Sequence, residues 1–503
     1  MKRLRSVGIA AIAFSCATST PPSTQKRAQE EVRTSSARGD ESPGMGYFPL
    51  PDALSADPTK VAIPKLDFKV RKPERISLEN GLTLYLAQDH ASPLVELRAM
   101  IAAGSVDDPA EKLGLAQVAF GLLSSSGTKE LTADALDELL EFQAADAQSN
   151  ASEEFSVLAL SLRSQDLEKL FPVFVEMLLR PRFQKDRFDI LIARSMESIR
   201  RRPDNPDSLA LRALRKAVFG AQSPFGREST EKTLKAISLA EVRKFHQRAV
   251  VPKATSLLIT GDFERDPALR LIREHLDAWK GGEKLERHYP PEPELKRRVI
   301  FVPKDIAQAK IRIGGHGFVR LSPMEYAFRV MNAAVGGGFG LARLYREVRG
   351  ARGLAYSTFS VVSPGPTSGL FYAGADTKPA TAVEATEAML EIFRDVEGSR
   401  PLSAEEISIA ADLYLNSFVF NFDSPSKIAF QKALFDINGY PEQYLDQYRD
   451  HIARVTVSSA LEAAKAIFKL DQMQIVVVGP AGKVGDLSRF GPVTTVKDVQ
   501  AFQ

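Results

Sequence analysis

Residues 238–261, SLAEVRKFHQRAVVPKATSLLITG, and residues 456–479, TVSSALEAAKAIFKLDQMQIVVVG, share one layout. Each stretch begins with a hydroxyl residue that can cap a helix, continues with helical periodicity and ends in an apolar strand followed by glycine. The two helix starts, Ser238 and Thr456, lie 218 residues apart, and the strands keep the same spacing. The repeated order predicts a duplicated α+β unit of about 200 residues.

The segments around these two stretches complete two units of the same kind. Apolar periodicity predicts strands at 82–86, 94–101, 155–162, 298–302 and 309–313, and helices at 114–123 and 326–335. The first two strands, which follow each other closely, are expected to pair. We therefore expect an α+β fold of two homologous domains, each a mixed or antiparallel sheet packed with helices.

The expected domains are residues 73–282 and 297–503. They are separated by 283–296, a charged and proline-rich stretch typical of a linker. Lys plus Arg number 66 and Asp plus Glu number 63, so the net charge is only +3. A protein without a strong basic excess is not expected to have nucleic acid as its main partner.

The N-terminus has the pattern of a targeting segment. A basic start precedes the short apolar stretch 7–14 and then Cys16, the only cysteine. We interpret 1–16 as a signal peptide of the lipoprotein type, with Cys16 lipidated and the protein anchored in a bacterial envelope facing the periplasm. Ordinary cleavage that discards Cys16, or a mitochondrial presequence, are the alternatives. Residues 17–72 are expected to be a disordered or extended tether, because the first part of this segment is rich in Ser, Thr, Pro and charged residues.

Several motifs resemble the insulinase, pitrilysin and mitochondrial processing peptidase family of zinc metallopeptidases across about residues 73–503. The second half carries the stronger match, at 326–332 (YAFRVMN), 336–339 (GGGF), 341–344 (LARL) and 353–357 (GLAYS); the first half matches at 114–117, 122–128 and 177–183. The resemblance implies that the two domains form half of a clamshell.

The resemblance also indicates where the zinc site of active members would lie and that its ligands are missing here. Active members of the family carry H-x-x-E-H on a first-half helix, and the matching residues here are Gln117, Phe120 and Gly121. None of the three supplies an imidazole ligand or a carboxylate base. Glu197 has the spacing of the family's third ligand and is either a relic or a salt-bridged surface residue. We expect no zinc or other cofactor in this chain, and we expect Phe120 to pack against apolar neighbours.

Other residues are expected to contact substrate because of the same resemblance. Arg349 and Tyr356 match an Arg–Tyr pair whose donors bind a substrate carbonyl; the alternative is a surface arginine and a core tyrosine. Gly337 and Gly338 match a substrate-contacting glycine loop, or else end a helix with left-handed backbone. The remaining two, Gln148 and Ser149, stand on an edge strand that pairs with peptide backbone.

These features predict a non-catalytic, substrate-binding subunit of a heterodimeric zinc metalloendopeptidase. Its partner would be an H-x-x-E-H subunit of the same family that holds the zinc, and its substrate an unstructured peptide. The alternative is a peptide-binding or scaffold protein of the same fold. An active enzyme with an unfamiliar site is a third possibility, although the six histidines show no ligand spacing.

Overall fold

The computed structural model describes residues 72–502. Residues 72–502 all belong to one compact unit. The predicted signal peptide with Cys16, and the predicted tether up to residue 71, lie outside the described residues. Within 72–502, none of the helices combines the length and apolarity needed to span a bilayer.

The first half of the chain builds a six-stranded sheet in the order β1-β2-β6-β3-β5-β4. Its strands are β1 Glu74–Ser77, β2 Thr83–Gln88, β3 Leu94–Ile101, β4 Asp146–Ala151, β5 Ser156–Arg163 and β6 Thr255–Gly261. The expected pairing of β2 with β3 is wrong, because β6 lies between them, parallel to β2 and antiparallel to β3. The six residues Thr255–Thr260 are all buried. This apolar run therefore forms a central strand of the sheet and not an outer strand beside a β2–β3 hairpin.

The second half builds a seven-stranded sheet in the order β13-β7-β12-β8-β11-β10-β9. Its strands are β7 Arg298–Pro303, β8 Ala309–His316, β9 Phe318–Val319, β10 Ala355–Gly365, β11 Leu370–Thr377, β12 Gln474–Gly479 and β13 Val493–Thr495. The central order β2-β6-β3-β5-β4 of the first sheet recurs as β7-β12-β8-β11-β10, with the same parallel and antiparallel pairs. The duplication predicted from the sequence is thus present in the fold.

Helices cover one face of each sheet. In the first half they are α3 Leu115–Gly121, α4 Ala133–Phe142, α5 Leu167–Leu179, α6 Lys185–Arg201, α8 Glu231–Lys235, α9 Leu239–Ala249 and α10 Arg265–Leu276. In the second half they are α11 Glu325–Asn332, α12 Ala382–Glu397, α13 Ala404–Ser417, α15 Tyr444–Ala453 and α16 Val457–Ile467. Both predicted caps form: the Ser238 hydroxyl accepts from the Glu241 N–H and the Thr456 hydroxyl from the Ser459 N–H.

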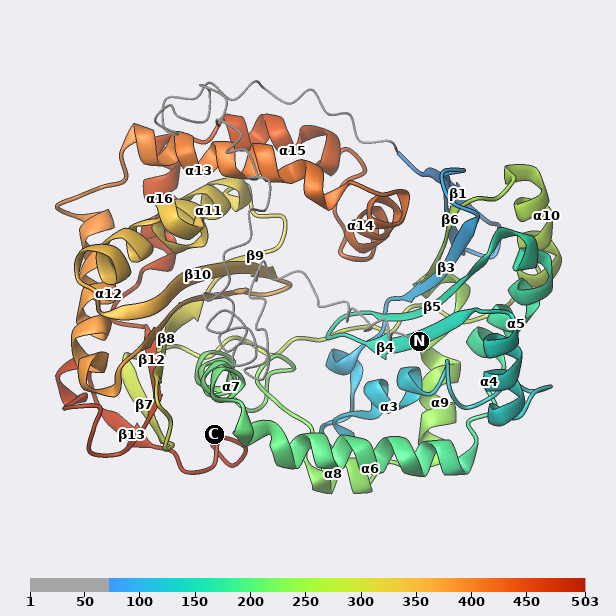
Figure 1. Cartoon of the computed structure of the whole chain (residues 1–503), viewed down its shortest axis with the longest axis horizontal. Coiled ribbons are helices and arrows are strands. Elements are labelled where there is room, and N and C mark those ends of the chain that lie inside the picture. Colours follow the sequence, from blue (N-terminus) through green and yellow to red (C-terminus); the bar gives the residue numbers. More distant parts are fainter. Residues whose placement is uncertain (1–71, 503) are drawn as a thin grey trace, which may run out of the picture. The chain divides into compact units, whose positions relative to one another are not determined.

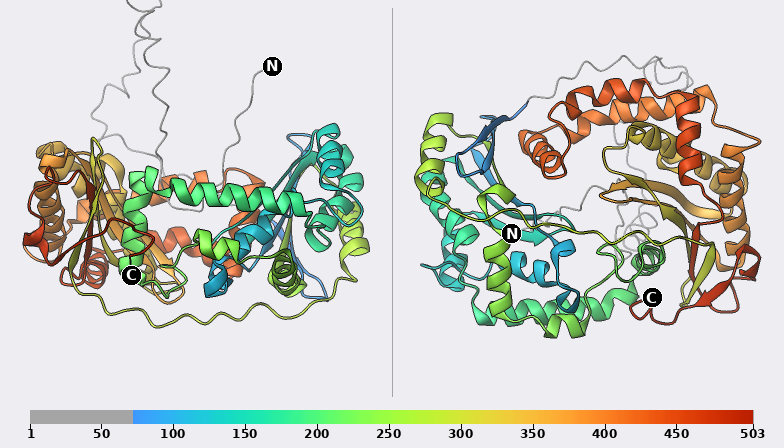
Figure 2. Two further views of the ribbon diagram at one scale, coloured as in Figure 1. Left: turned by 90° about the horizontal axis from the view of Figure 1, so that it is seen from below. Right: turned by 180° about the vertical axis from the view of Figure 1, so that it is seen from behind.

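The two halves exchange a helix (Figure 1). α7 Pro206–Phe219, from the first half of the chain, packs through Leu209, Ala213 and neighbours on Val476 and Val478 of the second sheet. α14 Pro425–Ile437, from the second half, packs through Ala429 and Ala433 on the first sheet. Both helices begin with proline after a polar cap, and their starts lie 219 residues apart. Each sheet is therefore completed by the other half, as the views from below and behind also show (Figure 2).

The predicted linker is anchored along its length. Residues 277–297 contain no helix or strand, but Arg287 forms a two-pronged ion pair with Asp107 at 2.9 and 2.8 Å. The same guanidinium donates to the Glu154 carbonyl oxygen at 2.6 Å, and the Glu154 carboxylate pairs with Arg320 of the second half. Ion pairs and hydrogen bonds of this kind connect residues on both sides of the predicted domain boundaries at 282 and 297. The boundaries themselves remain predictions.

Candidate functional site

The helix that matches the zinc helix, α3, is short and firmly held at its start. The buried carboxylate of Asp108 accepts the backbone N–H groups of Gly114 and Ala116, each at 2.7 Å. Burial raises the pKa of Asp108 to about 7, although these two hydrogen bonds act in the opposite direction. The cap fixes the direction in which the helix presents its side chains.

The three degenerate positions do not fit zinc. Gln117 is exposed, whereas Phe120 is fully buried and packs edge-to-face on Phe245, with ring centroids 6.1 Å apart. Gly121 offers no side chain, and a Cβ there would lie 3.3 Å from the Leu191 side chain. A zinc ion needs converging imidazole, thiolate or carboxylate ligands. Across residues 72–502, no group of three or more His, Cys, Asp or Glu is placed to hold a metal.

Glu197 is engaged in surface ion pairs on α6. Its carboxylate lies 2.7 Å from Arg201 Nε and 3.9 Å from Arg200 Nη1, and its side chain is 51% exposed. One exposed carboxylate cannot by itself hold a catalytic metal.

The strand that carries Gln148 and Ser149 lies at the edge of the first sheet. β4 pairs with β5 on one side, and it ends the sheet on the other. The Ser149 hydroxyl donates to Ser124 Oγ at 2.9 Å and accepts the Ser124 N–H at 3.1 Å, which ties the strand to the turn after α3. Gln148 is exposed and donates to Asp146 at 2.8 Å. Within residues 72–502, no strand pairs with the outer edge of β4, so this edge can accept an added peptide strand.

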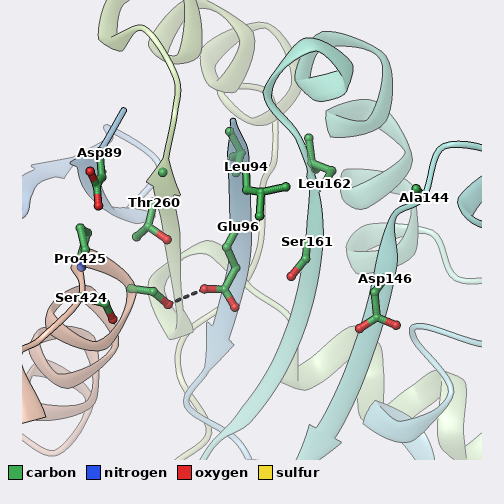
Figure 3. Close-up of a pocket in the computed structure, with 13 residues that line it drawn as sticks. Asp89, Leu94, Glu96, Ala144, Asp146, Ser161, Leu162, Thr260, Ser424 and Pro425 are labelled. Atoms are coloured by element: carbon green, nitrogen blue, oxygen red, sulfur yellow. Dashed lines mark hydrogen bonds between the residues drawn. The ribbon is translucent and has the colours of Figure 1, made fainter. Parts of the chain in front are cut away.

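A cavity of about 400 Å³ opens beside the start of β4 (Figure 3). Asp89, Glu96 and Asp146 line it from the first half, and Pro425 and Ser426 line it from α14. The Ser426 hydroxyl donates to the Glu96 carboxylate. Both halves of the chain therefore contribute to the surface beside the edge strand.

The glycine run at 336–338 serves close packing. It lies at the end of a π-helix, Ala333–Gly337, that packs against β10. A Cβ at Gly336 would lie 2.4 Å from Ser360 Oγ, and one at Gly338 would lie 2.5 Å from the Ala333 carbonyl oxygen. None of the three glycines has positive φ, so the alternative of a left-handed helix end is wrong. Gly337 is exposed, while its two neighbours are buried.

Arg349 and Tyr356 come together at the surface of the second half. Arg349 lies in a second π-helix, Tyr345–Ala351, and Tyr356 follows on β10. The guanidinium carbon of Arg349 lies 5.7 Å from the centre of the Tyr356 ring. Tyr356 is 73% exposed, which rules out the alternative that it is a core residue of its strand.

A β-bulge determines the direction of Tyr356. Ala355 pairs with Thr377 and Ser357 with Asp376, so Tyr356 is the extra residue of β10. A bulge leaves its residue unpaired and turns the side chain away from the regular alternation of the strand. π-Helical segments and bulges both concentrate at functional sites.

Salt bridges anchor the segment around Arg349. Buried Arg343 forms a two-pronged pair with Glu406, with both distances 2.7 Å, and Arg346 reaches the same carboxylate at 3.1 Å. Burial alone would raise the pKa of Glu406, but the hydrogen bonds from Arg343 and the Ser403 N–H, together with the positive charges of Arg343 and Arg346, lower the pKa to about 2. Arg352 pairs with Glu391 at 2.8 Å. In the described part of the chain, no carboxylate forms such a pair with Arg349.

Comparison with known proteins gives the family. Residues 83–227 match the profile of the insulinase family, peptidase family M16, and residues 236–414 match the profile described as the peptidase M16 inactive domain. The chain belongs to the insulinase family. The match to an inactive domain supports a member that has no peptidase activity of its own.

Individual relatives of this insulinase-family chain carry both kinds of name. An uncharacterised zinc protease of Mycobacterium tuberculosis is 24% identical over 82% of this chain and 94% of its own length. A non-peptidase homolog of Helicobacter pylori is 25% identical over 51% of this chain and 59% of its own length. The crystal structure of a peptidase M16 inactive domain from Pseudomonas fluorescens has the same fold, with a TM-score of 0.74 at 22% identity, and covers 83% of this chain and 100% of that one.

One aromatic residue beside the Arg349–Tyr356 pair, Tyr345, was not predicted from the sequence. Tyr345 is half-buried at the start of the second π-helix, and its ring centre lies 4.7 Å from the Arg349 guanidinium carbon. The available signal was the spacing of four residues, which places two side chains on one face of a helix.

Proposed function

We propose that this insulinase-family chain is the non-catalytic, substrate-binding subunit of a heterodimeric zinc metalloendopeptidase. The observation that carries the proposal is a contrast between the halves. Phe120 is buried in the core at the position of the family's catalytic glutamate, whereas Arg349 and Tyr356 lie together and exposed. One half has lost the chemistry of a zinc site, and the other presents two hydrogen-bond donors to a ligand.

The donors suit the carbonyl group of a bound peptide. A guanidinium offers N–H groups in one plane and a phenol offers one O–H, and both strengthen as negative charge develops on a carbonyl oxygen. The free edge of β4 suits the backbone of the same kind of ligand, an extended peptide. The partner would be an H-x-x-E-H subunit of the same family, and the zinc would be held there.

The proposed location is a bacterial cell envelope, with the folded part facing the periplasm on a lipid-anchored tether. Its support is the sequence pattern that ends at Cys16. A mitochondrial location is the alternative.

Affinity purification from the native organism tests the pairing. The tagged chain should retain a protein with H-x-x-E-H in roughly equal amount, and the complex should cleave an unstructured fluorogenic peptide until a chelator is added. The chain purified alone, without such a partner, should not cleave the peptide. Recovery of a stable assembly without any such peptidase would contradict the proposal and favour the scaffold alternative.

A further inference from the structure

We infer that Tyr345 is a positioning residue that holds the Arg349 guanidinium in the orientation needed to bind a peptide carbonyl. The inference rests on the proposed function, because it assigns the support of the same Arg–Tyr pair.

Two tyrosine rings contact the same guanidinium. The Arg349 guanidinium carbon lies 4.7 Å from the Tyr345 ring centre and 5.7 Å from the Tyr356 ring centre. Both values lie within the range of cation–π attraction, and the shorter contact is to Tyr345. Tyr345 is half-buried, whereas Tyr356 is 73% exposed, so Tyr345 is the more fixed of the two rings.

The type of contact matters for the proposed role. Arg343, Arg346 and Arg352 are held through N–H groups donated to the carboxylates of Glu406 and Glu391. Arg349 has no such partner among the described residues and is held by ring contacts instead. When a ring stacks on the face of a guanidinium, the N–H groups in the guanidinium plane stay free for a ligand.

The local backbone brings the two side chains together. Tyr345 and Arg349 are four residues apart in the π-helix Tyr345–Ala351. The start of this π-helix is fixed by the pair of buried Arg343 with partly buried Glu406, whose two distances are both 2.7 Å. The ring of Tyr345 therefore stands on a well-anchored segment and can fix the position of an exposed arginine.

A double-mutant cycle in the reconstituted, peptide-cleaving complex tests the inference. Tyr345→Leu removes the ring, and Tyr345→Phe keeps it as a matched control. We expect Tyr345→Leu to lower kcat about 3- to 10-fold with little change in KM, and Tyr345→Phe to stay within about 2-fold of the wild type. In an Arg349→Ala background, Tyr345→Leu should cost nothing further.

The outcomes separate the two ideas. If Arg349→Ala slows the complex and Tyr345→Leu does not, the positioning role of Tyr345 is overturned while the proposed function stands. If neither variant has any effect, the role of the Arg–Tyr pair falls as well. Equal losses from Tyr345→Leu with and without Arg349 would show that the ring acts on the fold and not through the arginine.

A second measurement needs no partner. In the isolated chain, ring currents should shift the NMR signals of the Arg349 side chain, assigned by their absence in Arg349→Ala. The shift should persist in Tyr345→Phe and move towards the value of a free arginine in Tyr345→Leu. An unchanged shift in Tyr345→Leu would contradict the contact itself.

Discussion

The guanidinium carbon of Arg349 lies 5.7 Å from the ring centre of Tyr356, although the two residues belong to different elements. A π-helix carries the arginine, and a bulge in β10 turns the tyrosine out of its sheet. Two local irregularities are thus needed to make one contact.

The first prediction concerns the isolated chain and zinc. We expect it to bind no stoichiometric zinc and to cleave no unstructured peptide, because Gln117, Phe120 and Gly121 offer no ligand set. Restoring His, Glu and His at these positions should not create activity. Phe120→Glu would bury a carboxylate against Phe245 and should lower the free energy of unfolding by at least about 3 kcal/mol.

Metal analysis, a fluorogenic peptide assay and urea unfolding provide the measurements. Gln117→His is the matched control, since Gln117 is exposed and its replacement should change stability by no more than about 0.5 kcal/mol. One zinc per wild-type chain together with chelator-sensitive cleavage would refute the prediction.

Short-range sequence patterns predict much of the fold. The cap at Ser238 and the apolar strand that ends at Gly261 could be recognised because periodicity and capping are local properties. The insertion of β6 between β2 and β3 could not, since it depends on which distant strand best fills a buried position. The exchange of α7 and α14 is long-range in the same way.

The candidate site also combines features that local sequence patterns predict with features that depend on long-range contacts. The spacing of Arg349 and Tyr356 was visible in the sequence. Their contact could not be predicted, because it depends on a β-bulge for which the sequence of β10 has no recognisable pattern. The glycine run suggested left-handed backbone, whereas Gly336 allows the close approach of Ser360 from another element and Gly338 that of the Ala333 carbonyl oxygen. Side-chain crowding from a neighbouring strand has no signature within the run itself.

The second prediction addresses the Arg–Tyr pair in the reconstituted complex. Arg349→Ala and Tyr356→Phe should each lower kcat by on the order of 10²-fold, because each removes one donor from a developing negative charge. Neither change should block assembly, since both side chains are exposed. Size-exclusion chromatography verifies intact complex before the kinetics are compared. Full activity in both variants would remove these residues from the mechanism.

The third prediction tests the helix exchange. Ala429 is fully buried where α14 packs on Tyr85, Met100 and Leu258 of the first sheet. Ala429→Asp should lower the free energy of unfolding by about 2–4 kcal/mol, since a charge would be buried without a partner. In urea, the loss should affect both halves in one transition. The exposed Ala307→Asp is the control, and separate transitions for the two halves would argue against a shared core.

The fourth prediction concerns the anchor. In a bacterial host, the wild-type chain should fractionate with membranes, and Cys16→Ser should release it into the soluble fraction. The reason is the position of the sole cysteine directly after an apolar stretch. Mass spectrometry of the mature N-terminus provides a second readout. A mature chain that begins after residue 16 would show that the cysteine is discarded.

The last prediction uses the Arg343–Glu406 pair that anchors the π-helix. The pKa of Glu406 falls from an ordinary 4.5 to about 2 in the folded protein, because the hydrogen bonds from Arg343 and the Ser403 N–H and the charges of Arg343 and Arg346 together outweigh the effect of burial. A carboxylate with a lowered pKa stabilises the fold above the unfolded pKa, and this contribution is lost as pH falls from about 4.5 to about 2. The difference corresponds to about 3 kcal/mol at neutral pH.

Glu406→Gln should therefore lower the free energy of unfolding by about 2–3 kcal/mol at pH 7, and by progressively less as the pH falls towards 2. Urea unfolding at a series of pH values measures the difference between variant and wild type. Glu462→Gln, at an exposed position of α16, is the matched control and should show no such pH dependence. A constant difference between Glu406→Gln and the wild type across this range would mean that the loss comes from packing rather than from the ionised carboxylate.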